Sequence, residues 1–261
     1  MKKVLTIAGS DSGGAAGLQA DLRAWAVLGV YGMCAITAVT AQNSLHVKAA
    51  QFMPADFIAT QLDVVLSDYG ADAVKTGFLG RVDLIETIAH QLNKYSLANV
   101  VIDPVLVNHK GEAMFAPEVT RAYIDHLIPL ADLVTPNRRE AELLTGLSVK
   151  TVAEMETAVH HIHALGPQNI FIKGGSDGDK MVDVFYDGAA IIHLRTRRID
   201  TQNTHGSGDT LSAAVCAYLA NGMKMKTAVR HAHQFAAKAI QKGANWKLGK
   251  GHGPVWAGEK K

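Results

Sequence analysis

The chain has 261 residues, of which 48% are apolar and 19% charged, and its formal net charge at pH 7 is +2. This length can bury a substantial core, and the composition is that of a globular protein rather than a disordered or fibrous one. The small net charge, with no lysine- and arginine-rich run interleaved with aromatic residues, argues against nucleic-acid binding. No apolar run approaches the roughly 18 residues of a membrane span, and no secretory core precedes the first predicted strand. We therefore expect a cytoplasmic protein with neither a nucleic-acid nor a membrane partner.

The first half of the chain alternates predicted strands and helices. Strands are predicted at residues 4–8, 31–40, 72–76 and 99–102, and helices after residue 14, at 54–67 and at 82–94. A glycine-rich loop that begins at Gly9 follows the first strand, but the Gly-x-Gly-x-x-Gly pattern of dinucleotide-binding proteins is absent. The loop is better suited to close backbone approach by a small ligand. Asp21 lies one helical turn from Gly17 and is expected to face this loop.

The second half continues the alternation. Helices are predicted at 117–130, 138–144, 152–165, 206–221 and 226–242, and strands at 133–135, 170–172, 182–186 and 190–197. Asp187-Gly188, between the last two strands, is a strong hairpin signal. Such alternation implies parallel pairing with right-handed crossovers, so we predict an α/β protein, a three-layer sandwich with a mainly parallel central sheet and an antiparallel edge. One domain spanning residues 1–261 is expected. Cys34 and Cys216 lie in apolar segments and are expected to be buried, reduced thiols.

The segment Thr-His-Gly-Ser-Gly-Asp-Thr at 204–210 is the strongest candidate for a functional site. A small-residue turn that opens a helix directs backbone N–H groups at an anion, and here those amides belong to Gly206, Ser207 and Gly208. Asp209 falls in the first turn of the helix, where a carboxylate beside an anion is unfavourable unless it has a task. That task would be to accept a proton from a substrate hydroxyl during phosphoryl transfer. A plain helix start with a capping Asp or Ser explains the tetrapeptide equally well when it is taken alone.

Polar side chains follow most of the predicted strands, where ligands bind in open parallel sheets. They are Asp11, Ser12, Gln42, Asn43, Lys75, Thr76, Asp103, Asn137 and Lys173. Lys173 is suited to meet phosphate charge, and Asp103 and Glu140 offer hard oxygen ligands to Mg²⁺, directly or through water. Asn137 could orient metal-bound waters or phosphate oxygens. The alternatives are a solvated strand-end lysine and a Glu140 that only complements the dipole of its own helix.

Two sets of histidines are considered as possible ligand-binding residues. His205 precedes the glycine-rich turn and either contacts a nucleotide or shapes the turn. His160, His161 and His163 fall on one predicted surface helix with no cysteine or carboxylate to complete a metal site, so we interpret them as solvated.

Motifs along nearly the whole chain resemble those of one enzyme family. They are Gly-Ser-Asp-Ser-Gly-Gly at 9–14, Gly-Leu-Gln-Ala-Asp-Leu at 17–22, Thr-Ala-Val-Thr-Ala-Gln-Asn at 37–43, Asp-Pro-Val at 103–105, Thr-Pro-Asn at 135–137, Lys-Gly-Gly at 173–175 and Gly-His-Gly-Pro-Val at 251–255. The order and content resemble the bacterial hydroxymethylpyrimidine/phosphomethylpyrimidine kinases of thiamine biosynthesis.

The resemblance implies a ribokinase-like fold, ATP with Mg²⁺, and a homodimer. It also implies successive phosphorylation of 4-amino-5-hydroxymethyl-2-methylpyrimidine and of its monophosphate. By the same resemblance Gln42 and Asp21 bind the pyrimidine, with Gly9 in the substrate loop. Lys173, Asn137, Glu140 and Asp103 serve ATP and metal.

Three residues depart from the family pattern. Asp209 stands where the family usually has cysteine and is typical of the wider ribokinase and sugar-kinase group. Lys110 replaces a small residue before Gly111, and Phe78 replaces a usual methionine near the ring-binding wall. Two alternatives therefore stay open, a pyridoxal kinase and a non-catalytic vitamin-binding module on the same fold.

Overall fold

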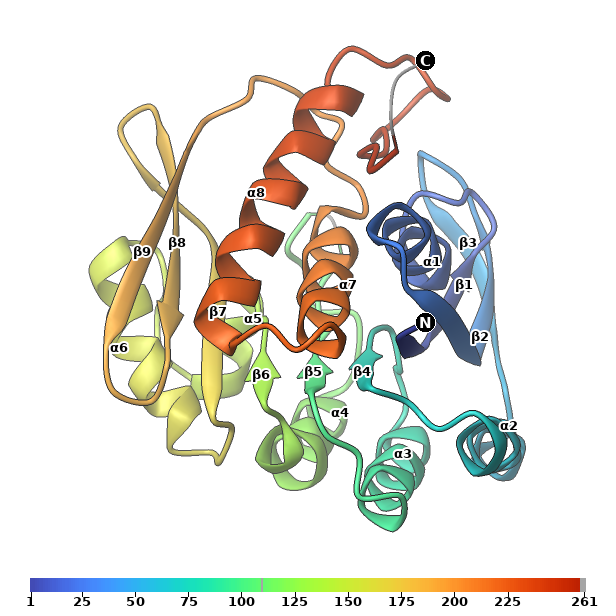
Figure 1. The fold of residues 1–261 in the computed structure, drawn as a ribbon. Helices are drawn as coiled ribbons and strands as arrows, with labels where there is room; N and C mark the ends of the chain where they lie inside the picture. The colour runs from blue at the N-terminus through green and yellow to red at the C-terminus, as the bar shows by residue number, and fades with distance from the viewer. Residues whose placement is uncertain (109, 259–261) are drawn as a thin grey trace.

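The structure, a computed structural model, describes residues 1–108 and 110–258. His109 and residues 259–261, which the predicted domain includes, lie outside the described part. Within it, one sheet has the strand order β3-β2-β1-β4-β5-β6-β7-β8-β9 (Figure 1). The strands are β1 Lys3–Asp11, β2 Tyr31–Gln42, β3 Val47–Phe52, β4 Ala73–Thr76, β5 Val100–Ile102, β6 Leu133–Val134, β7 Asn169–Asp177, β8 Lys180–Tyr186 and β9 Ile191–Arg197.

The centre of the sheet is parallel and both edges are antiparallel. Neighbouring strands from β2 through β1, β4, β5 and β6 to β7 pair in parallel. β3 pairs antiparallel with β2, and β7, β8 and β9 form an antiparallel meander. The prediction of a mainly parallel sheet is confirmed. Because the parallel strands run the same way, their carboxyl ends meet at one edge of the sheet.

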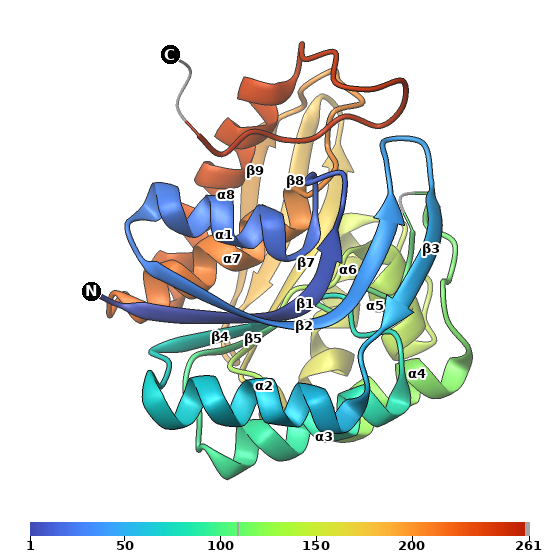
Figure 2. The same cartoon turned by 90° about the vertical axis from the view of Figure 1, so that its right-hand side faces the viewer.

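Helices cover both faces of the sheet, which makes the predicted three layers (Figure 2). One face carries α1 Gly17–Leu28, α7 Ser207–Ala220 and α8 Met225–Gly243, and the other carries α2 Ala55–Asp68, α3 Val82–Lys94, α4 Pro117–Ala122, α5 Arg138–Thr145 and α6 Val152–His163. Among the helices of the described residues, none has both the length and the apolar character needed to cross a membrane.

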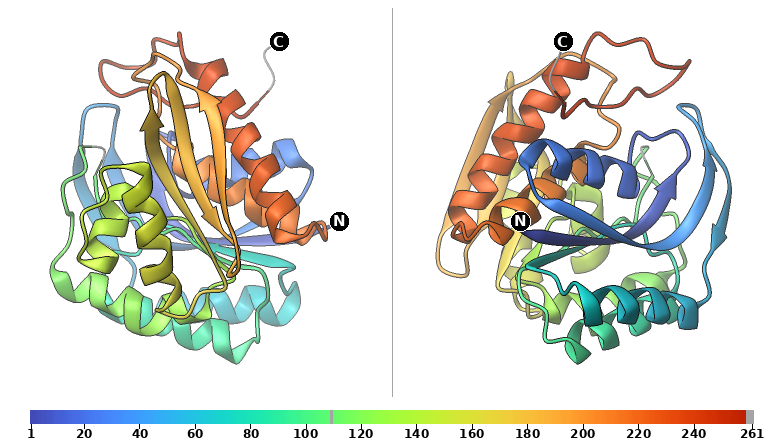
Figure 3. Two further views of the ribbon diagram at one scale, coloured as in Figure 1. Left: turned by 90° about the vertical axis from the view of Figure 1, so that its left-hand side faces the viewer. Right: turned by 45° about the vertical axis from the view of Figure 1, so that its right-hand side comes forward.

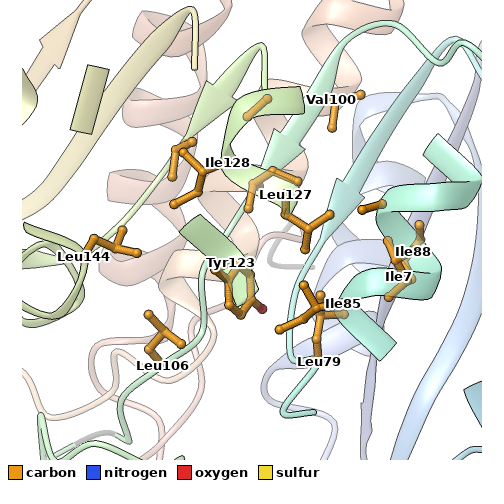
Figure 4. Packing of buried hydrophobic residues seen from close by; sticks show 14 of the residues in the cluster. Ile7, Leu79, Ile85, Ile88, Val100, Leu106, Tyr123, Leu127, Ile128 and Leu144 are labelled. Atoms are coloured by element: carbon orange, nitrogen blue, oxygen red, sulfur yellow. The ribbon is translucent and has the colours of Figure 1, made fainter. Parts of the chain in front are cut away.

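Alternating strand residues feed two separate cores. Leu5 and Val74 point to the face with α2–α6, whereas their neighbours Val4 and Ala73 point to the face with α1, α7 and α8. Figure 4 shows the larger core, in which Tyr123 lies among aliphatic side chains. Continuous apolar runs on the central strands are thus explained by burial on both faces.

Four details differ from the sequence prediction. β3 was not expected, because its residues are mostly exposed and show no apolar alternation. The predicted helix 117–130 divides into α4, a π-helical turn at Tyr123–Leu127 and a 3₁₀ turn at Ile128–Leu130. Pro129 lies in the last of these and cannot continue an α-helical hydrogen-bond ladder. β7 extends through Lys173 to Asp177. Cys34 is only half-buried, because β3 does not pair with this part of β2, whereas Cys216 is buried as expected.

The segment after α8 returns to the start of α7. His205 donates its backbone N–H to Gly253 over 3.1 Å and accepts from Val255 over 3.0 Å. The same segment extends toward the β2–β3 hairpin (Figure 3), where the N–H of Gly251 donates to Ser44 Oγ over 3.1 Å. The C-terminal segment therefore helps to shape the loop that opens α7.

Candidate active site

A buried ammonium group lies beneath the start of α7. Lys75 Nζ, on β4, is 2.8 Å from Asp21 Oδ1 and 3.2 Å from Asp209 Oδ1. Thr6 Oγ1 donates to Asp21 Oδ2 over 2.6 Å. The side chains of Lys75 and Asp21 are fully inaccessible, whereas that of Asp209 is 15% exposed. We call these three charged residues the Lys75 cluster, and Asp209 is its member that can reach a ligand.

A second ammonium group comes from β7, three strands from β4 in the order of the sheet. Lys173 Nζ is 3.0 Å from Asp103 Oδ1, which also accepts from Thr135 Oγ1 over 3.1 Å. Ser212, on α7, donates to Asp103 Oδ2 over 3.0 Å. Asp103 thus joins β5, β7 and α7. The side chain of Lys173 keeps 18% exposure, so its ammonium group faces the ligand space.

Asn137 and Glu140 form a reciprocal cap at the start of α5. Asn137 Oδ1 accepts from the N–H of Glu140 over 3.0 Å, and Glu140 Oε2 accepts from the N–H of Asn137 over 2.8 Å. Glu140 Oε1 accepts from the N–H of Leu106 over 3.3 Å. A β-bridge joins Asn137 to Lys173. The capping role of Glu140 is therefore real, and it also brings the carboxylate beside Lys173 and Asp103.

The turn that opens α7 depends on close approach of its backbone to other chain segments. Gly206 has φ 78°, and a Cβ there would lie 2.0 Å from the carbonyl oxygen of Ala15. A Cβ at Gly208 would lie 3.0 Å from Lys173 Nζ, so this ammonium group sits against the first turn of α7. The N–H of Ser207 donates to Thr204 over 3.1 Å and is used by the turn itself. Gly206 and Gly208 are the remaining amides for an anion.

The glycine-rich loop after β1 is held by Asp11. Its carboxylate accepts from the N–H groups of Gly13, Ala15 and Ala16 over 2.8, 2.9 and 2.9 Å. His205 Nε2 is 3.7 Å from Asp11 Oδ2 and 3.0 Å from Gln42 Nε2. The end of β2, this loop and the start of α7 therefore meet at His205.

Three phenylalanines form an aromatic wall beside Gly9. A Cβ at Gly9 would lie 3.0 Å from Phe78 Cδ1, so the ring covers this backbone directly. The Phe78 ring centroid is 5.8 Å from that of Phe52 and 5.5 Å from that of Phe115. A flat ligand lying over Gly9 would find an apolar side wall here.

Acidic groups outnumber basic ones in this buried region. Burial raises the pKa of Asp21 to about 7 against the attraction of Lys75, and it raises the pKa of Glu140 to about 7 against that of Lys173. Burial favours neutral Asp103 as well, but the two ammonium groups outweigh it and lower the pKa of Asp103. Burial alone would lower the pKa of both lysines, yet the carboxylates raise it.

This charge distribution suits a divalent cation. Four carboxyl groups, those of Asp21, Asp103, Glu140 and Asp209, face the ammonium groups of Lys75 and Lys173. No group of three or more His, Cys, Asp or Glu side chains within residues 1–108 and 110–258 could hold a metal unaided. Mg²⁺ commonly binds through one or two carboxylates with waters and phosphate oxygens, so Asp103 and Glu140 fit it when a nucleotide is present.

The structure brings most of the predicted site residues to one edge of the sheet and turns the Asp21 side chain elsewhere. The expectation that Asp21 faces the glycine-rich loop is wrong, because its carboxylate points to Lys75 and Thr6 instead. The side chain of His205 contacts Gln42, on the side of the glycine-rich loop. Lys75 received no role from the sequence, although a lysine within the otherwise apolar, buried strand 73–76 is a signal for one.

Lys110 and Phe78, two of the residues that depart from the family pattern, lie in different surroundings. Lys110 is exposed in the loop after β5, where its N–H donates to Asn108 Oδ1 over 2.9 Å. Phe78 belongs to the aromatic wall, so of the two it is the one that shapes the space over Gly9.

Comparison with known proteins agrees with this geometry. The phosphomethylpyrimidine kinase family model matches residues 11–256. The hydroxymethylpyrimidine/phosphomethylpyrimidine kinase of Rhizobium meliloti is 42% identical over 253 residues, covering 96% of this chain and 95% of that protein. The chloroplastic thiamine biosynthetic bifunctional enzyme of Arabidopsis thaliana is 42% identical over 95% of this chain. The chain spans about half the length of that relative, 48%.

A solved structure extends the likeness to the whole fold. The ADP complex of Bacillus subtilis pyridoxal kinase superposes with a TM-score of 0.92 at 42% identity, covering 98% of this chain and 97% of that one. The matched family model spans the glycine-rich loop from Asp11 onward, both lysines and the start of α7. The chain belongs to the phosphomethylpyrimidine kinase family.

Proposed function

We propose that this chain is an ATP-dependent kinase that phosphorylates the hydroxymethyl group of 4-amino-5-hydroxymethyl-2-methylpyrimidine and then its monophosphate, for thiamine diphosphate synthesis. One observation carries this proposal. The Lys173 ammonium group and the Asp209 carboxylate flank the same first turn of α7, so a phosphoryl group bound there meets a cation and a proton acceptor together. Residues 1–261 would act as one kinase domain, and the family resemblance supports a homodimer.

Asp209 would accept the proton of the substrate hydroxyl. The hydroxyl oxygen forms a bond to the γ-phosphorus of ATP while the bond from that phosphorus to ADP breaks. The backbone amides of Gly206 and Gly208, with Lys173, stabilise the charge on the transferring group. Positioning and charge neutralisation dominate such reactions, and a base adds roughly 10²–10⁴-fold.

Asp103 and Glu140 would hold Mg²⁺, directly or through water, and Asn137 would orient its waters or the nucleotide phosphates. The metal supplies charge neutralisation at the phosphates. Because Asp103 already accepts from Ser212 and Thr135, its oxygens are fixed before any ligand arrives.

The pyrimidine would lie over Gly9 against Phe78, with its polar edge on Gln42. A side-chain amide offers both a donor and an acceptor, which suits an aminopyrimidine. His205 hydrogen-bonds Gln42, which supports a role in fixing that amide as well as in contacting the nucleotide.

A coupled assay of ADP release tests this proposal with four acceptors: the pyrimidine alcohol, its monophosphate, pyridoxal and ribose. We expect turnover with the first two and none with ribose. Preference for pyridoxal would support the second candidate, which the likeness to Bacillus subtilis pyridoxal kinase favours. Pyrimidine binding by calorimetry without any ADP release would contradict both kinase assignments and indicate a binding module.

A further inference from the structure

Lys75 is a buried cation that the proposed chemistry does not yet use. It lies on the central strand β4, is completely inaccessible, and contacts two carboxylates from different helices. Lys173, by contrast, is partly exposed and adjoins Gly208, where phosphate is proposed to bind. Lys75 is therefore not available as a second phosphate ligand, because its ammonium group already lies between Asp21 and Asp209.

We infer, building on the proposed function, that Lys75 is a positioning residue that fixes the Asp209 carboxylate for proton transfer. The contact uses Asp209 Oδ1 and leaves Oδ2 for the substrate hydroxyl. It also gives Asp209 a cationic partner on the side away from the nucleotide. If Lys75 were absent, Lys173 would be the remaining ammonium group beside Asp209. An ion pair between Lys173 and Asp209 would then draw both side chains away from the phosphoryl group.

Asp21 fixes the position of the Lys75 ammonium group. Both of its oxygens contact Lys75 Nζ, at 2.8 and 2.9 Å, and one also accepts from Thr6. A Cβ at Gly77 would lie 3.3 Å from Lys75 Nζ, so the glycine leaves room for the ammonium group beside the strand end. Residues of β1, α1 and β4 thus determine where the Asp209 carboxylate lies relative to the sheet.

Several charged or titratable groups surround Asp209, and they determine how a test must be read. Lys75 faces it from β4, Asp21 from α1 and Lys173 from β7. Asp103, directly after β5, lies beyond Lys173. The thiol of Cys216, on α7, faces Asp21 and Lys75, and burial raises its pKa. A variant that removes only Lys75 would leave buried carboxylates without a partner, and the chain would be expected to unfold more easily.

The decisive variant is therefore the double change Lys75→Met with Asp21→Asn. Removing both charges avoids an unpaired buried carboxylate at position 21, and the new amide can still accept from Thr6. We expect the double variant to regain most of the Tm lost by Lys75→Met alone. Its kcat should stay at least about 10-fold below wild type with the KM for ATP within about 3-fold, since a positioned base contributes roughly 10²–10⁴-fold.

Asp21→Asn alone is expected to have a smaller effect. It loosens Lys75 but keeps its contact with Asp209, so kcat should fall less than in the double variant and the KM for ATP should stay within about 3-fold of wild type. Trp25→Phe is a structural control outside the Lys75 cluster, because it removes part of a buried ring and the indole hydrogen bond to the Ala213 carbonyl that joins α1 to α7. It should lower Tm while kcat stays closer to wild type than in the double variant.

Recovery of kcat together with Tm in the double variant would overturn the inference, as would a loss of kcat in Trp25→Phe equal to that in the double variant. If the double variant does not fold, Asp21→Asn alone decides, since an unchanged kcat contradicts the proposed role. Wild-type protein that turns over neither pyrimidine nor pyridoxal would contradict the proposed function itself. That result differs from a fully active double variant, which would contradict only the positioning role of Lys75.

Discussion

Ser212 Oγ donates a hydrogen bond over 3.0 Å to the Oδ2 atom of Asp103, the carboxylate that also pairs with Lys173. Ser212 lies one turn into α7, and its hydroxyl contacts the carbonyl of Gly208 at 2.9 Å as well. A single hydroxyl therefore sets the start of α7 relative to β5 and β7. Small shifts of this helix would move the Gly208 amide and Asp209 away from Lys173.

Ser212→Ala should lower kcat/KM as well as stability. The lost hydrogen bond to a charged acceptor is worth about 1.5–3 kcal/mol at most, and the small cavity adds little. We expect kcat/KM to fall about 10-fold through misplacement of the helix start. Thr135→Val is the matched control, because it removes a hydrogen bond to the same carboxylate without touching α7. Equal losses of kcat/KM in both variants would show that only the Asp103 carboxylate matters.

Asp209→Asn should abolish most turnover while ATP binding survives. The amide is close in size but cannot accept the hydroxyl proton, so kcat should fall roughly 10²–10⁴-fold. ATP affinity, measured by calorimetry without acceptor, should change by less than about 3-fold. Turnover equal to wild type would reject Asp209 as the base.

Gln42→Ala should weaken pyrimidine binding far more than nucleotide binding. The proposed polar contacts are lost, and His205 loses its side-chain partner at 3.0 Å. Calorimetric titrations with pyrimidine and with ATP measure the two effects separately. Gln51→Ala, an exposed change on β3, serves as the control. A defect confined to nucleotide binding would contradict the placement of Gln42.

Gly206→Ala and Gly222→Ala separate backbone conformation from close approach. Both glycines have positive φ, 78° and 83°, but only at Gly206 would a Cβ collide with backbone, the Ala15 carbonyl oxygen. At Gly222 nothing lies within 4 Å. We expect Gly222→Ala to cost about 1 kcal/mol and retain turnover, because only the left-handed conformation penalises it. Gly206→Ala should lower Tm more and lose turnover; similar Tm losses would contradict the importance of the Ala15 contact.

Stability should depend on pH through Glu140. Its pKa is raised from 4.5 to about 7 by burial, so the folded state favours the protonated carboxyl. The stabilisation from this group is present below about pH 4.5 and is lost as pH rises toward 7. Glu140→Gln should therefore reduce the change in urea midpoint between pH 5 and 8, and the part that remains is expected from Asp21, whose pKa burial also raises to about 7. Saturating Mg²⁺ with ATP should flatten it in the wild type too, since a bound cation favours the ionised carboxylate. A wild-type midpoint that does not fall over this range would contradict the prediction.

Local sequence patterns were enough for most of the fold. Burial on both faces requires continuous apolar runs, as at 100–102 and 133–134, and glycine or proline marks their ends. β3 could not be predicted from apolar alternation, because an exposed edge strand needs no apolar face. The division of the helix at 117–130 required attention to Pro129, which cannot supply a helical N–H.

The site was predictable where the chemistry lies at strand ends and unpredictable where it depends on side-chain direction. The proximity of Asp103, Lys173 and Asp209 was predictable, because the carboxyl ends of parallel strands meet at one edge of the sheet. The Lys75 cluster was not predicted, because it depends on the Lys75 and Asp21 side chains turning toward each other in the interior. Whether Asp21 points to a loop or into the interior depends on how α1 packs on β1 and β4, and helical spacing alone does not determine this.

The pairing of His205 with Gly253 and Val255 has a consequence for biosynthesis. A nascent polypeptide that has emerged only as far as α8 contains the glycine turn, both lysines and Asp209, but not the backbone that pairs with the turn. Vectorial synthesis thus delays assembly of the phosphate-binding end of the molecule until residue 255 has left the ribosomal tunnel.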